Sequence, residues 1–392
     1  MKLLHIIPDE KFSLLADSIF EGAFPGSNKF LVYQLSNDGP LVHQHPENSI
    51  TVRRNEEGKR IILEEIPKYG VVVLHSFKPF ISELLGAVHL PGVLIWSFWG
   101  YEIYNDHKLL RKQWSTAFSR SLQFKGLKRI TTRLRLDRKT GFPSLLFGKA
   151  DPAKRSLLRQ VGAVATFIDG DVAMLKHHGL LSANCSRVRF NYYSLEDITS
   201  GFDSAVPLGN SVLLGNSAFP TNNHAEILPL LSKALTPDRT VRVPLSYGND
   251  NYRKEIITLG NTILGQRFAP ITDFVPLAEY NNKLADCGFV VMNHLRQQAL
   301  GNLTFMLWRG CRVFLRQENS LYAYFKGLGM LIQSVADLRK NPRLLSRFLT
   351  EDEKLANRKI LEEVFSRAAI IRQLREDVQN LAQEYESAES RS

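Results

Sequence analysis

Cysteine is scarce in this sequence. Its 392 residues include only Cys185, Cys287 and Cys311. They lie far apart and form no CxxC motif, so neither a disulfide framework nor a cysteine-based zinc site is expected. This usage is typical of a protein from a reducing compartment such as the cytosol.

Long apolar runs are missing as well. We find no window of about 18 uncharged apolar residues, so we expect no transmembrane helix. The first apolar run is broken by Pro8 and two acids, which makes it too short for the hydrophobic region of a secretory signal. A hydrophobic content of 44% with 23% charged residues is typical of a soluble globular protein. The length suggests two or three domains.

Acidic residues are nearly absent between Lys108 and Arg159. This stretch holds 15 Lys and Arg against two acids, while the whole chain has a formal net charge of +11. Such a patch favours an anionic partner, and the apolar residues among the basic ones favour a membrane surface. The alternative is a pair of solvated helices whose apolar side packs in the core. We see no RRM, KH or helix-turn-helix signature, so we do not expect nucleic acid as the partner.

Short apolar runs alternate with helical patterns in both halves of the sequence, which predicts βαβ units and a parallel sheet in each half. The run Val71–His75 is continuous and β-branched, as in a strand buried on both faces. The linker Ser194–Leu208 separates the halves. We therefore expect Rossmann-like domains at 1–205, with the basic segment at about 108–159, and at 206–340. Other predicted strands include Leu3–Ile7, Lys29–Gln34, Arg60–Glu65, Val93–Phe98, Gly162–Ile168, Val212–Leu214, Thr240–Pro244, Phe289–Met292 and Arg312–Leu315.

The tail at 341–392 is predicted to be helical. Its apolar residues keep a heptad spacing over about two repeats, which is short for a coiled coil. The spacing favours a helix that packs back on the first domain, and a homodimer contact is the second possibility. The heptad positions are Ile371, Leu374, Val378, Leu381 and Tyr385.

Polar loops follow the predicted strands of the second half, where open parallel sheets bind ligands. No GxGxxG dinucleotide fingerprint is present. Gly215, Asn216 and Ser217 follow one strand, and we expect Asn222 or Asn223 to cap a helix whose amides attract phosphate. An ordinary loop rich in turn-forming residues explains this stretch equally well. Two halves that each carry a predicted Rossmann-like domain, without this fingerprint, fit a two-domain nucleotide-sugar transferase.

Taken together and in order, these loops resemble the TDP-N-acetylfucosamine:lipid II N-acetylfucosaminyltransferases, glycosyltransferase family 56. The resemblance covers most of residues 1–335. The loop Ala218–Thr221 departs from the more polar turn expected in the family, and Glu102 stands where the family tends to show Asp. The matching segments are Leu214–Ser217 with Asn223 and His224, Val243–Gly248 with Asn251 and Tyr252, Glu279 and Tyr280, Arg296–Gln298 with Gly301, Glu318 and Asn319, and, in the first half, His75, Trp99, Gly100, Glu102 and Tyr104.

The resemblance implies an α/β fold of the GT-B type, with two Rossmann-like domains facing a cleft and a C-terminal helical tail. It implies transfer of an N-acetylfucosamine-like amino-deoxy sugar from a dTDP-sugar, or a UDP-sugar, to a polyprenyl-diphosphate-linked saccharide. Peripheral attachment to the cytoplasmic face of the bacterial inner membrane and independence of metals or other cofactors are also implied. The alternatives are another nucleotide sugar and acceptor on the same fold, or a non-catalytic protein that binds nucleotide sugars or anionic polymers.

Glycosyl transfer requires a held diphosphate leaving group and a base for the acceptor hydroxyl. Arg296 is the cation that we expect against the diphosphate, because a guanidinium matches phosphate geometry. Glu318 is expected on the ribose hydroxyls. The only DxD motif, Asp169–Asp171, falls in the first half, so we expect no metal site. The donor-binding assignments are Gly215, Asn216, Ser217, Asn223, Ser246, Tyr247, Gly248, Tyr252, Arg296, Gln297, Gln298, Gly301, Asn302, Glu318 and Asn319.

Glu102 is the expected base, because it follows an apolar strand between aromatic residues where burial would raise its pKa. Asp9 and His75 are the alternatives. A lone histidine at a strand end is more often a satisfied structural residue, which ranks His75 below Glu102. The residues assigned to acceptor binding are Trp99, Gly100, Tyr101 and Tyr104.

Overall fold

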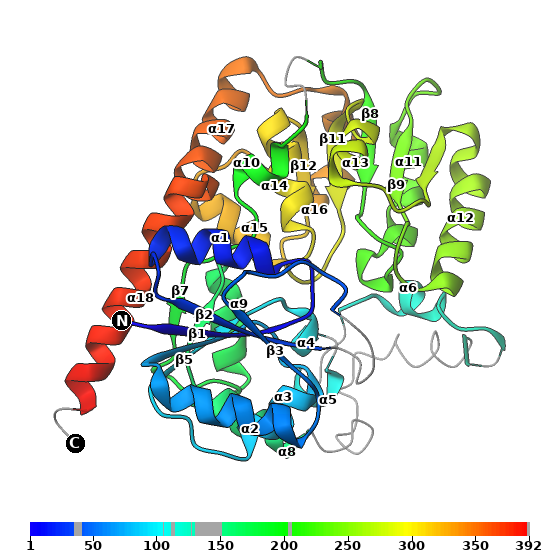
Figure 1. The fold of residues 1–392 in the computed structure, drawn as a ribbon. Coiled ribbons are helices and arrows are strands. Elements are labelled where there is room, and N and C mark those ends of the chain that lie inside the picture. Colours follow the sequence, from blue (N-terminus) through cyan, green and yellow to red (C-terminus); the bar gives the residue numbers. More distant parts are fainter. Residues whose placement is uncertain are drawn as a thin grey trace. The chain divides into compact units, whose positions relative to one another are not determined.

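The described residues of this computed structural model form two compact units (Figure 1). Unit 1 comprises the described residues within Met1–Arg111, Ser144–Ser194 and Phe365–Ser392, and unit 2 comprises those within Lys112–Pro143 and Leu195–Val364. The structure describes residues 1–34, 41–104, 106–110, 114–126, 128–129, 151–202 and 206–389.

Unit 1 is built on a seven-stranded parallel sheet within its described residues, in the order β3-β2-β1-β4-β5-β6-β7. Strands β1 and β4 are buried along their whole length, because helices cover both faces of the sheet. In Figure 1, α1 lies above the strands and α2, α3 and α8 lie below them. The strands are β1 (Leu3–Pro8), β2 (Asn28–Tyr33), β3 (Ser49–Val52), β4 (Val71–Leu74), β5 (Val93–Ser97), β6 (Val161–Ala165) and β7 (Ser186–Val188).

The helices of unit 1 lie between its successive strands, as in βαβ units, except for α18, which follows the last strand of the chain. They are α1 (Ser13–Ala23), α2 (Glu56–Glu65), η1 (Ile66–Lys68), α3 (Pro79–Gly86), α4 (Tyr101–Tyr104), α5 (His107–Leu110), α8 (Pro152–Gln160), α9 (Asp169–His177) and α18 (Arg367–Glu389).

One predicted strand of unit 1 is wrong. Residues Arg60–Glu65 belong to α2, which begins after Asn55. The Asn55 side chain accepts a hydrogen bond from the Gly58 amide at 2.9 Å, and two glutamates in the first turn suit the helix N-terminus. These capping signals, together with the inward-facing Ile62 and Ile66, outweigh the β-branched residues in this stretch. The strand of this region, β3, lies earlier in the chain.

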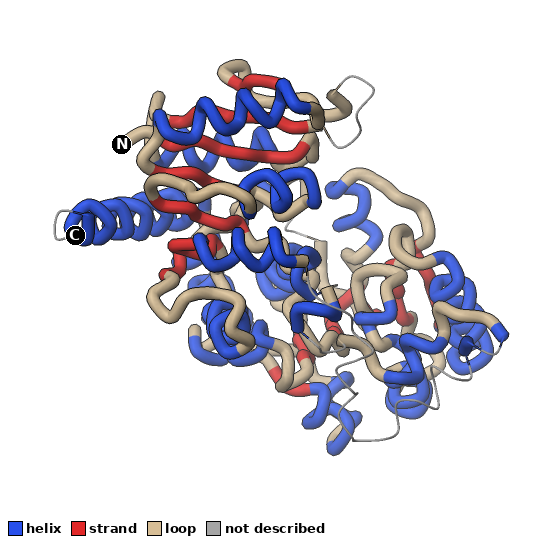
Figure 2. Tube along the Cα trace, turned by 90° about the horizontal axis from the view of Figure 1, so that it is seen from below, coloured by secondary structure: helices blue, strands red, loops and turns tan. Residues whose placement is uncertain are grey.

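Unit 2 carries a six-stranded parallel sheet within its described residues, in the order β10-β9-β8-β11-β12-β13. The prediction of a parallel sheet in each half of the chain is therefore confirmed, and Figure 2 shows strands of both units flanked by helices. The strands are β8 (Ser211–Leu214), β9 (Val241–Pro244), β10 (Phe268–Ile271), β11 (Cys287–Met292), β12 (Arg312–Leu315) and β13 (Gln333–Ser334).

Unit 2 contains both α-helices and short 3-10 helices within its described residues, and two of the 3-10 helices lie in the loop after β8. They are α6 (Ala117–Ser121), α10 (Leu195–Thr199), η3 (Pro220–Asn222), η4 (His224–Glu226), α11 (Leu228–Ala234), α12 (Asp250–Leu264), η5 (Gly265–Arg267), α13 (Leu277–Lys283), α14 (Leu300–Arg309), α15 (Ser320–Gly327), α16 (Val335–Lys340), η6 (Pro342–Ser346) and α17 (Glu351–Phe365).

The tail divides between the units. Helix α17 belongs to unit 2 except for Phe365, whereas α18 packs against α1 in unit 1. The Arg375 guanidinium donates hydrogen bonds to the carbonyls of Gly22 and Ala23, both at 2.8 Å. Leu374 and Val378 are buried. Two of the predicted heptad positions thus contribute to the core of unit 1.

Apolar side chains in the described part of the basic segment pack in the protein core, whereas several of its polar residues, such as Lys125 and Lys128, are exposed. Leu109, Leu110 and Trp114 are buried, and Leu122 belongs to the hydrophobic core of unit 2. Arg129 forms a bidentate ion pair with Glu255 at 2.8 and 2.9 Å. The rest of this predicted membrane-facing segment, residues 111–113, 127 and 130–150, lies outside the described residues. No helix within the described ranges is long and apolar enough to cross a membrane.

Candidate active site

The loops after β8, β9 and β11 are hydrogen-bonded to one another at the carboxyl edge of the unit 2 sheet. Asn216 donates from Nδ2 to the Tyr247 hydroxyl at 3.1 Å, and its Oδ1 accepts from Gln298 Nε2 at 2.8 Å. Thr221 Oγ1 donates to Gln298 Oε1 at 2.9 Å. Parallel strands bring their carboxyl ends to one edge, so residues from three separate predicted loops form one polar cluster.

Asn222 is the centre of this cluster, and it is fully buried. Its Oδ1 accepts from the Asn216 amide and from His294 Nε2, both at 2.8 Å. Its Nδ2 donates to Ser217 Oγ at 3.0 Å. His294 therefore carries its proton on Nε2. Burial, with the nearby Arg296 and His224, holds the pKa of His294 well below its ordinary value, so the ring is neutral.

The expected helix cap at Asn222 or Asn223 is wrong. Asn223 adopts a left-handed conformation with a φ of 50°, which interrupts the helical path. Its side chain donates to the Asn293 carbonyl at 3.1 Å, and Asn293 donates back to the Asn223 carbonyl at 2.9 Å. Helix α11 starts only at Leu228. Both asparagines join loops instead of capping a helix.

Two glycines of the cluster shape the loops themselves. Gly215 has a φ of 69°, and a Cβ there would lie 2.3 Å from His224 Nε2 and 2.7 Å from Asn222 Oδ1. Gly248 has a φ of 131°, and its Cβ would lie 2.5 Å from the carbonyl carbon of Ala218. The Ala218 amide donates to the Tyr247 carbonyl at 2.7 Å. In this structure both glycines allow protein groups, not a ligand, to approach.

The β11–α14 loop presents cationic and amide groups. Helix α14 begins at Leu300. Its N-cap, Ala299, is left-handed with a φ of 63° and offers no side-chain cap. The first amides of a helix have no partner inside it and carry a partial positive charge. Half-buried Arg296 lies on the same loop, with Nη1 donating to the Gln297 carbonyl at 2.9 Å.

The remaining predicted donor-site residues divide into buried and accessible groups. Tyr252 is buried in the core with its hydroxyl against His224, and Asn319 is buried as the N-cap of α15. Asn302 donates to the Tyr280 hydroxyl at 2.7 Å. The buried residues are Gly215, Asn216, Ser217, Asn223, Tyr252 and Asn319; the half-buried or exposed ones are Ser246, Tyr247, Gly248, Arg296, Gln297, Gln298, Gly301, Asn302 and Glu318.

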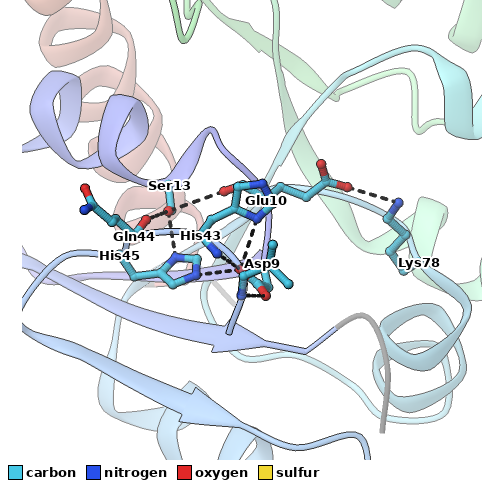
Figure 3. A network of polar contacts seen from close by, with 8 residues as sticks. Asp9, Glu10, Ser13, His43, Gln44, His45 and Lys78 are labelled. Atoms are coloured by element: carbon cyan, nitrogen blue, oxygen red, sulfur yellow. Dashed lines mark hydrogen bonds and ion pairs between the residues drawn. The ribbon is translucent and has the colours of Figure 1, made fainter. Parts of the chain in front are cut away.

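Asp9 lies at the carboxyl end of β1 in unit 1, inside a network of four hydrogen bonds (Figure 3). Its Oδ2 accepts from the Val42 amide at 2.7 Å. Its Oδ1 accepts from His45 Nε2 at 2.8 Å, from the His43 amide at 3.1 Å and from His43 Nδ1 at 3.3 Å. Burial alone would raise the pKa of this carboxyl, but these hydrogen bonds together hold the pKa below its ordinary value.

The predicted acceptor-binding aromatic residues Trp99 and Tyr101 lie on the same edge of unit 1. Phe12 packs edge-on against Trp99, with ring centroids 4.9 Å apart. Lys78 Nζ lies 4.9 Å from the centroid of the Tyr101 ring and 3.5 Å from the Glu10 carboxylate. Two aromatic surfaces and a cation are thus grouped beside the loop that carries Asp9.

His75 is a satisfied structural residue. Its Nε2 bonds to His5 Nδ1 at 3.0 Å, and its Nδ1 accepts from the Tyr192 hydroxyl at 2.6 Å. The Asn28 amide oxygen accepts from His5 Nε2 at 3.1 Å. His5 Nδ1 is therefore the acceptor of the hydrogen bond that His75 Nε2 donates. The Trp99 indole donates to the Tyr192 oxygen at 2.8 Å. Burial lowers the pKa of both histidines, that of His5 to about 3. Both rings are therefore neutral and shielded from solvent, so neither can act as a base toward a substrate.

Glu102 is buried, and neither carboxyl oxygen reaches the surface. Desolvation raises its pKa to about 7, against smaller opposing effects of Lys154 and Trp96. The expected pKa shift is therefore present, but the carboxyl has no access to an acceptor hydroxyl in this structure. Tyr104 is also buried and donates to Asp171 of the DxD motif at 2.7 Å. Gly100, with a φ of 87°, precedes helix α4 and is buried as well.

Both carboxylates of the DxD motif are engaged within unit 1. Asp171 is buried against Tyr104, and Asp169 pairs with Arg187 at 2.5 Å. Both lie in the first turn of α9. No group of three or more metal-ligating side chains suited to an ion occurs among the residues that the structure describes.

Residues 166–338 match the family described as 4-alpha-L-fucosyltransferase, glycosyl transferase group 56. The Anabaena protein Alr3699/HepE in complex with UDP is similar in structure, with a TM-score of 0.62 and 12% identity over 97% of this chain and 100% of that chain. A Rickettsia africae glycosyltransferase aligns with a TM-score of 0.58 and 12% identity over 97% and 98% of the two chains. Sucrose-phosphate synthase from Thermosynechococcus elongatus aligns with a TM-score of 0.57 and 10% identity over the full length of both chains.

The chain is a glycosyltransferase with the GT-B fold. The predicted fold class is confirmed by the structural neighbours and the two parallel sheets. The matched region begins at the end of β6 and extends over most of unit 2, including all four loops predicted for the donor site.

Sequence reasoning missed three residues that organise the carboxyl edges of the two sheets, His294, His43 and His45, and it gave Asn222 the role of a helix cap. Asn222 and His294 link the unit 2 loops, and His43 and His45 contact Asp9. The pattern His43-Gln-His45 in a polar loop after a predicted strand was the available signal for the second pair. No local pattern marks the first pair, because its members are separated by 72 residues.

Proposed function

We propose that this glycosyltransferase moves an N-acetylfucosamine-like amino-deoxy sugar from a dTDP-sugar to a polyprenyl-diphosphate-linked saccharide in bacterial surface polysaccharide synthesis. The 4-alpha-L-fucosyltransferase family match supports the sugar class. Structures of the similar Anabaena protein with UDP and with UDP-glucose support a pyrimidine-nucleotide donor, and a UDP-sugar is the alternative.

The observation that carries the proposal is the grouping of polar loops at the carboxyl edge of the unit 2 sheet. Three of them are joined through Asn216, Tyr247 and Gln298. Beside them lie Arg296 and the start of α14, which has no side-chain cap. A guanidinium and unpaired helix amides are the groups that bind a diphosphate and stabilise its charge as it leaves. The proposed leaving-group stabilisation therefore uses Arg296 and α14 and needs no metal.

The donor sugar and nucleotide are proposed to contact the accessible residues of these loops. Tyr247 is exposed beside Phe219, with ring centroids 6.2 Å apart, and these rings offer a surface on which the nucleobase of the donor can stack. Exposed Glu318 remains the proposed partner of the ribose hydroxyls. Gly301 is exposed, and a Cβ there would meet nothing within 4 Å, so its surroundings leave room for a ligand.

The acceptor is proposed to bind at the unit 1 edge. Trp99 and Tyr101 offer aromatic surfaces for sugar or prenyl groups, and Lys78 supplies a positive charge for a diphosphate linkage. We further propose peripheral attachment to the cytoplasmic face of the inner membrane through the basic stretch Lys108–Arg159. Its net positive charge supports binding to anionic lipid. Replacing Lys and Arg by Glu across Arg111–Lys139 should then release the protein from anionic liposomes.

A nucleotide-binding measurement tests the donor site. Addition of dTDP or UDP should raise the melting temperature of the full-length protein, because a ligand that binds the folded state stabilises it. Arg296→Ala should abolish this shift. The matched control is Arg343→Ala, which removes an exposed arginine of unit 2 outside the loops. An unchanged shift in Arg296→Ala would remove Arg296 from the site, and no shift in wild type would contradict the donor site as a whole.

A transfer assay tests the donor and acceptor together. Wild type should transfer sugar from dTDP-N-acetylfucosamine to a polyprenyl-diphosphate-linked disaccharide and release dTDP. A parallel reaction with UDP-glucose distinguishes the two nucleotide classes. Release of UDP from UDP-glucose alone would keep the glycosyltransferase assignment and replace the proposed sugar.

A further inference from the structure

His43 is the only one of the two histidines on Asp9 that has substantial solvent access. Its side chain is 36% exposed, whereas that of His45 is 4% exposed and that of Asp9 is 6% exposed. His45 uses both ring nitrogens: Nε2 bonds to Asp9, and Nδ1 bonds to Ser13 Oγ at 2.7 Å. Within the part of the chain that the structure describes, His43 Nε2 has no hydrogen-bond partner. Nε2 of His43 is thus the ring nitrogen of this described cluster that is left without a partner, and it belongs to the side chain that solvent reaches.

The hydrogen bonds fix which nitrogen of His43 carries the proton. Asp9 accepts four hydrogen bonds, and their combined effect keeps it ionised at neutral pH. An ionised carboxylate can only accept, so His43 Nδ1 must donate to it. The lone pair of the neutral ring then lies on Nε2, the nitrogen that is available to a substrate. A carboxylate behind an imidazole also stabilises the imidazolium that forms when the ring takes up a proton.

We infer that His43 is the general base that activates the acceptor hydroxyl, with Asp9 as the positioning residue behind it; this inference rests on the proposed function. Nε2 of His43 takes the hydroxyl proton while the acceptor oxygen forms a bond to the anomeric carbon of the donor sugar. The bond from that carbon to the diphosphate oxygen breaks, and the diphosphate leaves with the electron pair. The proton remains on His43 until product release and is then lost to water.

His45 and Ser13 hold Asp9 in place from the other side. Ser13 is fully buried and also lies 3.0 Å from the Gln44 carbonyl. The two histidines flank Gln44, and both bond to the same carboxylate oxygen. The contacts of His45 with Asp9 and Ser13 limit rotation of the Asp9 carboxyl, so that Oδ1 stays directed at the His43 ring.

Access to solvent separates His43 from the other titratable groups of this sheet edge. His75 and Glu102 are buried, and His75 has partners on both ring nitrogens. The charged groups near the Asp9 loop are Glu10 and Lys78, which pair with each other at 3.5 Å, and Lys11, whose ammonium lies over the Phe12 ring. Of the described histidines and carboxylates at this edge, His43 alone combines an accessible nitrogen with a carboxylate behind the ring.

The test compares His43→Gln with Asp9→Asn in the full-length protein. His43→Gln should lower kcat by about 100-fold or more, the usual contribution of a general base, while the thermal shifts with dTDP and UDP stay unchanged. Asp9→Asn should lower kcat similarly, as expected when a base loses its orienting carboxylate. His89→Gln is the matched control, because His89 is an exposed histidine elsewhere in unit 1, and its activity should equal that of wild type.

A spectroscopic readout separates positioning from simple damage to the fold. Nitrogen-15 NMR of histidine-labelled protein, assigned with His43→Gln, should show His43 protonated on Nδ1 in wild type near pH 8. Asp9→Asn should lose this preference while its melting temperature with dTDP remains shifted. A wild-type ring protonated on Nε2 would overturn the assignment.

The outcomes distinguish this inference from the proposed function. If wild type binds neither nucleotide and transfers no sugar, the proposed function fails and the base assignment falls with it. If wild type transfers sugar and His43→Gln keeps a rate within about tenfold of wild type, only the base assignment is overturned.

Discussion

The carboxyl edges of the two parallel sheets carry different chemistry. In unit 2 the edge consists of amides, hydroxyls and neutral imidazoles that bond to one another, with Arg296 as its cation near α14. In unit 1 the edge carries the ionised Asp9, the partly exposed His43 and the Glu10–Lys78 pair. The first arrangement suits the holding of an anion, and the second suits the movement of a proton.

The comparison also shows that position at a sheet edge does not by itself assign a role. Asp9, His75 and Glu102 all follow strands of unit 1, and the sequence ranked them by neighbouring residues. In the structure, Glu102 and His75 face the interior, whereas Asp9 is coupled to a ring that reaches solvent. Access to solvent decides which titratable group can meet a substrate.

The largest effect on stability is expected from Gly215→Ala, which tests whether the unit 2 edge is a tightly packed network. The new Cβ would approach His224 and Asn222 to within 2.7 Å or less, at a φ of 69°. Left-handed strain and overpacking together should lower the free energy of unfolding by about 3 kcal/mol. Urea unfolding measures this change, and binding of dTDP should be lost with it.

Gly329→Ala is the matched control for this prediction. It has a φ of 81° in the same unit, but a Cβ there would meet nothing within 4 Å. Only backbone strain remains, so the free energy of unfolding should fall by about 1 kcal/mol. Equal losses in the two variants would show that the contacts of Gly215 with Asn222 and His224 contribute nothing.

Glu102→Gln tests the buried carboxyl of unit 1 through the pH dependence of stability. The folded pKa of about 7 lies above the ordinary 4.5, so the folded state binds the proton more tightly than the unfolded state. This contribution is fully present below pH 4.5 and is lost as the pH rises through 7. For a buried group the loss amounts to about 3 kcal/mol.

The Gln variant cannot titrate, so its stability relative to wild type should increase between about pH 4 and pH 8. Urea unfolding across this range measures the difference. A flat difference, together with complete loss of transfer activity, would place Glu102 in the chemistry and contradict the assignment of His43.

A small effect is expected from Tyr247→Phe in the unit 2 edge. The variant removes a hydroxyl that accepts a hydrogen bond from Asn216 Nδ2 at 3.1 Å and also interacts with Ser217, and Tyr247 is already partly exposed. The free energy of unfolding should fall by about 0.5 kcal/mol. Binding of dTDP should weaken only slightly, because the ring is retained. Complete loss of binding would instead make the hydroxyl a direct ligand of the nucleotide.

Local patterns in the sequence were sufficient for most of the fold. The β-branched run Val71–His75 and the apolar run Val93–Phe98 correspond to β4 and β5. The mistake at Arg60–Glu65 arose because isoleucines suit either a strand or the buried side of a helix. The capping bond from Gly58 to Asn55 resolves this ambiguity only in three dimensions.

The candidate site was less predictable, because long-range packing decides which polar atoms remain accessible. The sequence identified the loops at Gly215, Tyr247 and Gln298 as neighbours, and the structure joins the Tyr247 and Gln298 loops through Asn216. It could not show that Asn222 would bond to His294 across 72 residues and so cease to be a cap. Similarly, a polar loop with several histidines gave no sign that His43 and His45 would share one carboxylate.

The central claim is that nucleotide binding resides in unit 2 and proton transfer in unit 1. The most direct test measures dTDP affinity and kcat for His43→Gln and Arg296→Ala under the same conditions. His43→Gln should keep the dTDP affinity of wild type and lose about 100-fold or more in kcat, whereas Arg296→Ala should weaken dTDP binding by about tenfold or more. If Arg296→Ala binds dTDP like wild type, or if His43→Gln retains its turnover, this division of roles is contradicted.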